Sequence, residues 1–272
     1  MSCDARLFGQ LRRLKMRNGP DAMIFDLDGV ITFTASVHAA AWKQLFDEFL
    51  KERSVRLHEP YREFTVEGDY LTYVDGKPRY EGVASFLASR GIIIPHGSPS
   101  DPLTAQTVCG LGNRKDDLFN ERVRQTGVDV DQDAVRFVRE LRDRGIRVGL
   151  ATSSRNAVPI LERVRIRDLF DEIVDGVVSD RLNLRGKPEP DIFLQCLSQL
   201  TSSADPRKAG IAEDAVSGVI AGQRGRFALV LGVDRHSTGA LASNGANWVI
   251  SDFSQITADQ AIAFFSGPAR AA

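Results

Sequence analysis

Short runs of apolar residues alternate with amphipathic segments along most of the chain. Six runs have the length and composition of buried strands, and they cover residues 22–25, 148–151, 173–174, 209–212, 228–231 and 248–250. Between them, apolar side chains recur at helical spacing, as at Phe193, Cys196, Leu197 and Leu200. Strands that alternate with helices predict an α/β fold, with a parallel sheet covered by helices on both faces.

One interval between predicted strands is far longer than a crossover connection needs. Within it, Trp42, Leu45, Phe46, Phe49 and Leu50 form a strong amphipathic stripe, and Val83, Phe86 and Leu87 form a second one. Residues 90–103 are rich in proline, glycine and serine, which is typical of a surface loop. The pattern predicts a mostly helical domain at 35–128, inserted into an α/β domain made of residues 1–34 and 129–272.

The composition is that of an ordinary globular protein, with 26% charged and 43% hydrophobic residues. The net charge of −1 gives no overall attraction to nucleic acid or to anionic membranes. The sequence contains no apolar run of about 18 residues, so we expect no transmembrane helix. Residues 1–20 carry Arg12, Arg13, Lys15 and Arg17 with no apolar segment after them. We therefore expect a solvated, basic helical extension here rather than a secretory signal.

The cysteines indicate a reducing compartment. Cys3, Cys109 and Cys196 are far apart in the sequence, and the chain has no C-x-x-C motif. This pattern favours neither a disulfide framework nor a cysteine zinc site, and it predicts a cytoplasmic protein. The sequence does not fix the oligomeric state, and a monomer is compatible with it.

Two pairs of acidic residues follow predicted strands. Asp26 and Asp28 end the first strand, in AMIFDLDGV, and Glu213 and Asp214 end the strand at 209–212. Ligands bind at the carboxyl ends of parallel strands, so the four acids are expected to face one site. Close carboxylates repel one another unless a cation or a shared proton relieves them, and such oxygen ligands suit Mg²⁺. A lone D-x-D is more often a solvated turn, so the prediction depends on the combination.

Two further motifs could bind an anion. Thr152, Ser153 and Ser154 follow the strand at 148–151 and precede a predicted helix, where hydroxyl and N–H groups can hold a negative group. The alternative is a simple N-cap formed by Ser153 or Ser154. Lys187, in RGKPEPDIF, precedes a helix whose first turn is expected to contain Pro190. Held there it would supply a fixed positive charge, although an isolated lysine is usually exposed.

These motifs, in this order and each at a strand end, resemble the haloacid dehalogenase-like (HAD) superfamily of phosphotransferases. The stretches DLDGVITFTASVHAAAW, ATSSRN, GKPEPDIF and EDAVSG are most similar to its β-phosphoglucomutase-like branch. The resemblance implies a Rossmann-like core with an inserted helical cap. It also implies an Mg²⁺-dependent enzyme that acts on a small sugar phosphate, with conversion of β-glucose 1-phosphate to glucose 6-phosphate as the expected activity.

The resemblance assigns roles to the motif residues. Asp26 would be the nucleophile that forms an aspartyl-phosphate, and Asp28 would be the general acid and base. Mg²⁺ would bind Asp26, the backbone carbonyl of Asp28, Asp214 and Glu213. Thr152 and Lys187 would hold the phosphoryl oxygens. The other substrate-binding residues would be Thr34, His38, Arg79, Ser153, Ser154, Arg155 and Asn156, with Arg79 gripping a distal phosphate.

Two positions depart from the family pattern. Phe33 stands where the family normally has Asp, which would cap the first cap helix. We expect Thr34 or Ser36 to provide this cap and the Phe33 ring to pack at the hinge. Glu121 stands, in an ungapped alignment, where the branch carries a cap lysine. Either Arg122 or Lys115 would then take the place of that lysine, or the specificity has moved.

Three other functions are considered. A phosphatase acting on a sugar phosphate or another small phosphomonoester stays open, because an aspartyl-phosphate can pass its phosphoryl group to water or to a sugar hydroxyl. A dehalogenase is disfavoured, because enzymes of that kind attack carbon without Mg²⁺ and typically lack the second Asp. A non-catalytic phosphate-binding protein is disfavoured because all four motifs are intact.

Overall fold

The computed structural model describes residues 19–266, so nearly all of the predicted basic extension lies outside the described residues. Six strands form one parallel sheet in the order β3-β2-β1-β4-β5-β6. The strands are β1 (Ala22–Phe25), β2 (Arg147–Ala151), β3 (Glu172–Val174), β4 (Ala209–Glu213), β5 (Leu229–Val233) and β6 (Trp248–Ile250). Each lies within two residues of a predicted apolar run. The predicted α/β class with a parallel sheet is therefore confirmed.

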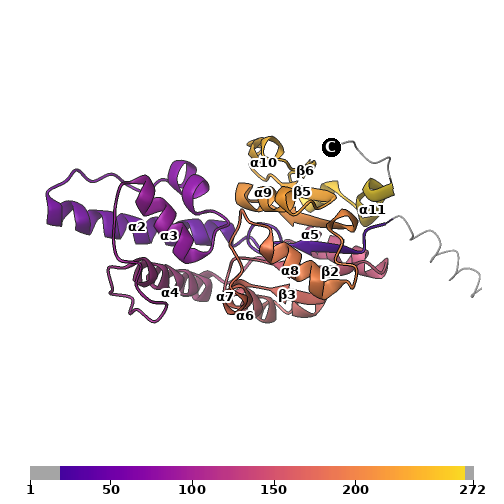
Figure 1. Ribbon diagram of the computed structural model, residues 1–272, viewed down its shortest axis with the longest axis horizontal. Coiled ribbons are helices and arrows are strands. Elements are labelled where there is room, and N and C mark those ends of the chain that lie inside the picture. The colour runs from indigo at the N-terminus through magenta and orange to yellow at the C-terminus, as the bar shows by residue number, and fades with distance from the viewer. Residues whose placement is uncertain (1–18, 267–272) are drawn as a thin grey trace, which may run out of the picture.

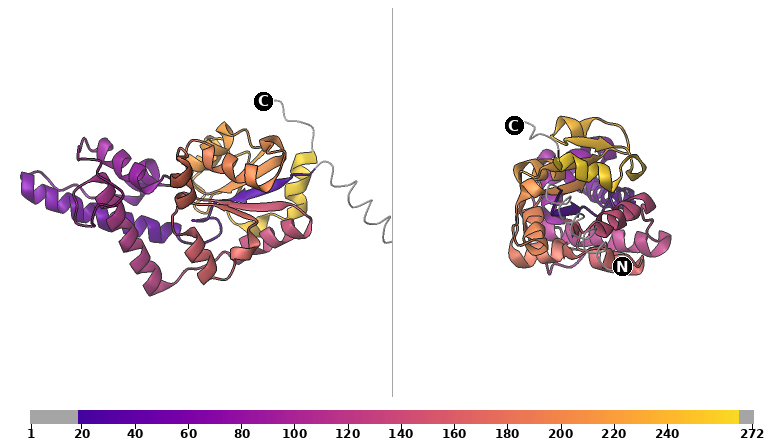
Figure 2. Two further views of the ribbon diagram at one scale, coloured as in Figure 1. Left: turned by 60° about the horizontal axis from the view of Figure 1, so that its bottom comes forward. Right: turned by 90° about the vertical axis from the view of Figure 1, so that its right-hand side faces the viewer.

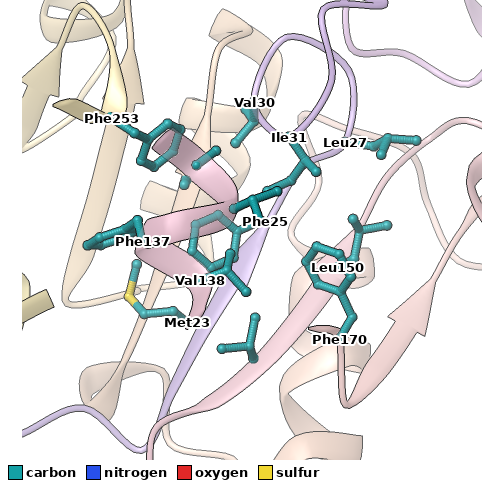
Figure 3. Close-up of a cluster of buried hydrophobic side chains, with 14 of the residues drawn as sticks. Met23, Phe25, Leu27, Val30, Ile31, Phe137, Val138, Leu150, Phe170 and Phe253 are labelled. Carbon is teal, nitrogen blue, oxygen red and sulfur yellow. The ribbon is translucent and has the colours of Figure 1, made fainter. Parts of the chain in front are cut away.

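Strand β1 lies inside the sheet and is buried on both faces. Its residues alternate between two hydrophobic clusters, because successive side chains of a strand point to opposite faces. Met23 and Phe25 belong to one cluster, which includes Phe137 and Phe253 (Figure 3). Ala22 and Ile24 belong to the other. This continuous burial explains why β1 is apolar at every position up to Asp26.

Helices cover both faces of the sheet (Figure 1). They are α5 (Gln132–Asp143), α6 (Ala157–Arg163), α7 (Gly176–Leu182), α8 (Asp191–Leu200), α9 (Val216–Arg224), α10 (Ala240–Ser243) and α11 (Ala258–Ser266), with short 3-10 turns η3 (Arg167–Leu169), η4 (Pro206–Lys208) and η5 (Phe253–Gln255). Buried residues of α5, α6 and α11 share the cluster of Phe25, and those of α8 and α9 share the cluster of Ile24. Pro190 is the N-cap residue of α8 and lies one position before the first turn predicted for it.

Four of the five described helices between β1 and β2, all before α5, form a second group, called here the helical unit: α2 (Ala35–Leu57), the π-helix η2 (Val66–Val74), α3 (Arg79–Ser89) and α4 (Val108–Thr126). The group extends from one end of the sheet (Figures 1 and 2). It has its own hydrophobic cluster, in which the rings of Phe46, Phe64 and Phe86 are fully buried against one another. Truncating one such ring to Ala typically costs about 3–5 kcal/mol.

The two chain segments that join the helical unit to the sheet lie side by side. The Phe33 N–H donates to the Asp129 carbonyl at 2.9 Å, and the Asp131 N–H donates to the Ile31 carbonyl at 3.0 Å. The Phe33 ring lies at this junction, 43% exposed, with the Arg235 guanidinium 4.7 Å from its centroid. The junction therefore consists of two paired backbone segments with a partly covered ring beside them.

The expected N-cap of α2 is wrong. Thr34 occupies the N-cap position, but its hydroxyl donates to the Asp28 carboxylate instead of capping the helix. The Ser36 hydroxyl reaches back to the Phe33 carbonyl at 3.4 Å. The side chain of Thr34 is therefore committed to Asp28, a contact across six residues that no helix-capping rule anticipates.

Among the described residues, no helix combines the length and the apolar character that crossing a membrane requires.

Candidate active site

Three carboxylates meet where β1 and β4 end. Phe25 pairs with Ala212 in the sheet register, so Asp26 and Glu213 follow at the same edge. One ligand atom each of Asp26, Glu213 and Asp214 lies within 4.8 Å of the other two. Gly29, at φ +80°, allows this approach, because a Cβ there would lie 1.7 Å from Asp214 Oδ2. The edge thus holds a compact set of oxygen ligands of the kind that binds a divalent cation.

Lys187 is fully buried beside these carboxylates. Its Nζ atom donates to Asp26 Oδ1 at 2.7 Å and to the Glu213 carboxylate, and its side chain is 1% exposed. Burial opposes its charge, but Asp26 and Glu213 outweigh this and raise the pKa of Lys187. Lys187 is therefore a permanent cation inside the site, and the alternative of an exposed surface lysine does not apply.

One lysine does not balance the acidic group. Burial, together with the neighbouring Glu213 and Asp28, raises the pKa of Asp26 to about 8 even though Lys187 acts to lower it. Burial also raises the pKa of Asp214 well above its usual range, with further contributions from Asp75 and Glu213. Buried carboxylates that are this reluctant to ionise are stabilised by an added cation. The donor set therefore fits Mg²⁺, which favours carboxylate oxygens.

The Asp28 carboxylate points elsewhere, toward Thr34 and His38. His38 Nε2 lies 3.2 Å from Asp28 Oδ1, although its N–H is not aimed straight at that oxygen. Lys115 Nζ contacts His38 Nδ1, and an ammonium can only donate, so the imidazole proton must be on Nε2. Burial favours protonated Asp28, but His38, the Thr34 hydroxyl and Lys115 together outweigh it and lower the pKa of Asp28.

The imidazole of His38 is held neutral. Burial, together with the adjacent Lys115 charge, lowers its pKa. Its ring stacks on Phe119 with centroids 3.9 Å apart, which fixes its orientation. Lys115 is itself 4% exposed, and its ammonium faces the rings of Trp42 and Phe119 at about 5 Å. Asp28, His38 and Lys115 thus form one connected polar chain that crosses from the sheet edge into the helical unit.

A cavity of about 140 Å³ lies between the sheet edge and the helical unit. It brings together most residues predicted to act in catalysis or to bind substrate, and these are Asp26, Asp28, His38, Arg79, Thr152, Ser153, Ser154, Arg155, Asn156 and Lys187. Thr34 lies beneath Asp28, outside the cavity wall, and is 1% exposed. Arg155 is already paired with Asp180.

The loop between η2 and α3 closes one side of this cavity. The Ser153 hydroxyl donates to the Gly76 carbonyl at 2.9 Å, and the Ser217 hydroxyl donates to the Asp75 carbonyl at 3.0 Å. Ser153 lies in the loop after β2 and Ser217 in the first turn of α9, whereas both acceptors belong to the loop of the helical unit. The two parts of the molecule therefore meet through backbone carbonyls directly over the acidic group.

Comparison with known proteins places this arrangement in a family. A sequence model of the haloacid dehalogenase-like hydrolase family matches residues 20–226. The chain belongs to this haloacid dehalogenase-like family. It is 42% identical over 239 residues to the β-phosphoglucomutase of Mycobacterium bovis, covering 86% of this chain and 90% of the relative.

Two further proteins are similar to most of this chain at lower sequence identity. The "Phosphorylated carbohydrates phosphatase" of Thermotoga maritima is 29% identical over 78% of this chain and 85% of its own length. The crystal structure of a Clostridium difficile β-phosphoglucomutase covers 91% of this chain and 97% of its own, with a TM-score of 0.69 and 22% identity. The latter similarity establishes the fold, a Rossmann-like core with an inserted helical part.

Lys115, and not Glu121, reaches the cavity from α4. Glu121 is half exposed and pairs with Arg124 on the outer side of α4, away from the cavity. Lys115, six residues earlier in the same helix, lines the cavity and contacts His38. Of the two substitutes considered, Lys115 is therefore the one that is placed in the site, while Arg122 donates to Gln44. The sequence alone could not show this, because helical periodicity does not say which polar side chain of α4 turns toward the cavity.

Two acids of the site were missed at the sequence level. Asp75, in YVDGKPR, is partly buried beside Tyr70, and its loss of hydration raises its pKa to about 6, with Glu213 adding to the rise. Asp116 follows Lys115 and also lines the cavity. Both lie in the helical unit, where neither strand ends nor motif spacing draw attention to a carboxylate. The sequence signal that could have pointed to Asp75 is the Asp-Gly turn just before Arg79, a predicted substrate-binding residue.

Proposed function

We propose that this protein is an Mg²⁺-dependent phosphomutase that converts β-glucose 1-phosphate to glucose 6-phosphate through an aspartyl-phosphate on Asp26. The observation that carries the proposal is that two clusters of polar side chains, one from the sheet edge and one that leads to the helical unit, line the same cavity. The acidic group with Lys187 lies on the sheet side, and the Asp28–His38–Lys115 chain leads to the helical unit. The β-phosphoglucomutase relative, at 42% identity over most of the chain, supports the same activity.

The helical unit serves, in this proposal, as a cap over the reaction site. The cap comprises residues 35–128, and residues 1–34 with 129–272 form the core. The paired segments at Ile31–Phe33 and Asp129–Asp131 lie at these boundaries and would act as the hinge. The Ser153–Gly76 and Ser217–Asp75 contacts hold the cap loop over Asp26 and exclude water, which favours a sugar hydroxyl as acceptor.

Asp26 is the nucleophile of the proposed reaction. One carboxylate oxygen attacks phosphorus, a new P–O bond forms, and the bond from phosphorus to the sugar oxygen breaks. Lys187 and the Thr152 hydroxyl, at the same sheet edge, bind phosphoryl oxygens. Ser153, Ser154, Arg155 and Asn156 follow Thr152 around the cavity and add polar contacts to the substrate.

Asp28 moves the proton in both half-reactions. Protonated, it donates to the leaving sugar oxygen, and as the carboxylate it then accepts the proton of the hydroxyl that attacks the aspartyl-phosphate. Thr34 and His38 orient this carboxylate, and Lys115 orients His38. Because His38 joins Asp28 to a cap residue, proton transfer is linked to the position of the cap.

Mg²⁺ would be held by Asp26, Glu213, Asp214 and the backbone carbonyl of Asp28, and when bound it neutralises phosphoryl charge and favours the ionised form of Asp26.

The substrate is a small molecule, and no nucleic-acid partner is expected from the net charge of −1. A cytoplasmic location stays a prediction. Cys109 and Cys196 are buried and free, and Cys3 lies outside the described residues.

A product assay separates the mutase from a sugar-phosphate phosphatase, which the Thermotoga maritima relative makes the second candidate. The enzyme is supplied with Mg²⁺, β-glucose 1-phosphate and a trace of glucose 1,6-bisphosphate, and glucose 6-phosphate and free phosphate are followed together. The mutase gives glucose 6-phosphate with little free phosphate. Phosphate release without glucose 6-phosphate would refute the mutase and establish the phosphatase.

The nucleophile is tested by Asp26→Asn. The variant should fold, because it removes a buried carboxylate whose ionisation is disfavoured, and it should show no turnover above background. Retained activity in a clean preparation would overturn the assignment of Asp26, and covalent labelling of wild-type Asp26 with phosphate would support it.

A further inference from the structure

One carboxylate joins the cap to the core across the cavity. Asp116 Oδ2 lies 2.8 Å from Nη1 of Arg79, and Asp116 Oδ1 accepts a hydrogen bond from Asn156 Nδ2 at 2.9 Å. Arg79 begins α3 and Asp116 lies in α4, while Asn156 precedes α6 at the sheet edge. Asn156 is the N-cap residue of α6, yet its side chain is committed to Asp116 rather than to its own helix.

The groups that hold Asp116 are the groups that would hold a phosphate. Arg79 and Asn156 line the same cavity as Asp26 and Lys187. A guanidinium fork and an amide N–H bind carboxylate and phosphate oxygens in the same way. Arg79 Nε is buried and has no hydrogen-bond partner among the described residues, so a donor of the fork stays available for a further oxygen. The Asp116 carboxylate therefore satisfies only part of this anion site.

We propose that Asp116 is an internal competitor of the substrate, occupying the Arg79 and Asn156 groups that the distal phosphate of a hexose bisphosphate needs. This inference rests on the proposed phosphomutase function and names a specificity-determining residue within it. A bound phosphate must displace the carboxylate from Arg79 or share the guanidinium with it. In either case the negative charge of Asp116 lowers the affinity for a dianion.

The competition has a use in a mutase cycle. The bisphosphate intermediate must be held while it turns over, yet it must also be able to reorient between its two phosphates. An anion that is part of the protein can return to Arg79 and Asn156 whenever the phosphate leaves them. The same carboxylate then restores a cap-to-core contact, because Asn156 belongs to the core and Arg79 to the cap.

The test measures binding of glucose 1,6-bisphosphate by calorimetry in the full-length Asp26→Asn protein, which cannot turn over. Adding Asp116→Asn removes the charge and keeps the size of the side chain. We expect it to tighten binding about 10-fold, or about 1.4 kcal/mol. The matched control is Asp117→Asn in the same background, because Asp117 is exposed on the next position of α4 and loses the same charge. That control should change the affinity less than about 2-fold.

A third variant locates the effect. In the Arg79→Ala background the gain from Asp116→Asn should be clearly smaller, because the part that acts through the guanidinium is lost and only the direct repulsion between Asp116 and the phosphate remains. Unchanged or weaker bisphosphate binding by the Asp116→Asn protein would overturn the inference, as would an undiminished gain without Arg79. Failure of the bisphosphate to bind even the Asp26→Asn parent would overturn the phosphomutase proposal itself, so the two failures are distinguishable.

Discussion

His38 holds the Asp28 carboxylate from one side, with Nε2 3.2 Å from Oδ1, and is itself fixed by Lys115 at Nδ1. This contact lowers the pKa of Asp28, so its loss should raise that pKa. We predict that His38→Ala lowers kcat roughly 10- to 100-fold. It should also move the acidic limb of the pH–rate profile to higher pH. His58→Ala, at the exposed C-cap of α2, is the control. An unshifted profile would show that His38 has only a packing role.

Burial of Lys115 should lower stability in a pH-dependent way. Burial is the main reason that its pKa falls from 10.5 to about 8. Between these values the unfolded chain binds more protons, so stability rises with pH there, and the full penalty is present below pH 8. We predict that Lys115→Met raises the unfolding free energy by about 1–3 kcal/mol at pH 7 while lowering activity.

The Lys115 prediction is checked by urea denaturation at pH 7 and pH 9.5. The stability difference between wild type and Lys115→Met should shrink at the higher pH, because wild-type Lys115 is then mostly neutral. Lys208→Met removes an exposed lysine and should leave stability within about 0.5 kcal/mol at both values. A Lys115→Met protein that is less stable than wild type at pH 7 would contradict the argument.

Gly76 should be essential for the contact between the cap loop and Ser217 at the sheet edge. It adopts φ +70°, and a Cβ there would lie 2.2 Å from the Ser217 hydroxyl oxygen. Gly91 shares the conformation, at φ +66°, but among the described residues nothing lies within 4 Å of its added Cβ. Either change to Ala should cost about 1 kcal/mol of stability. Only Gly76→Ala should lower kcat/KM, by about 10-fold or more, with a larger share of free phosphate. Equal kinetic effects of the two variants would refute this role.

Phe33→Asp should leave the chemistry intact. The ring is 43% exposed and contacts Arg235, which also donates to the Gly29 carbonyl at 2.9 Å and pairs with Asp131 at 2.6 Å. The variant exchanges a cation–π contact for an ion pair, so the unfolding free energy should change by less than about 1 kcal/mol. Rapid-quench measurement of aspartyl-phosphate formation should give a wild-type burst. Phe33→Ala separates loss of the ring from gain of the charge. A folded Phe33→Asp protein without the burst would count against this prediction.

The sequence predicted those parts of the molecule that follow from local pattern. The strands that carry Asp26, Thr152 and Glu213 are short, wholly apolar runs, and parallel strands must present their carboxyl ends at one edge. The acidic residues could therefore be assigned to one site before their distances were known, whereas Lys187, which precedes a helix, was assigned to it only through the family resemblance.

The contacts made by the helical unit could not be predicted in this way. Asp116 meets Arg79 and Asn156 from positions 37 and 40 residues away, and this depends on how α4 is rotated. A helix pattern fixes which face is apolar but not which polar side chain reaches across a cavity. The same limit explains why the sequence could not choose between Arg122 and Lys115, of which Lys115 reaches the cavity.

The hydrophobic cluster of the helical unit lies entirely within residues 39–111 and draws no side chain from the sheet. Its sequence can therefore drift, or be exchanged by recombination at the paired segments near Phe33 and Asp129, while the carboxylates of the sheet edge are inherited unchanged. Proteins that arose in this way would catalyse the same phosphoryl transfer on different substrates. A chimera that carries residues 35–128 from a relative would be the laboratory equivalent of that history.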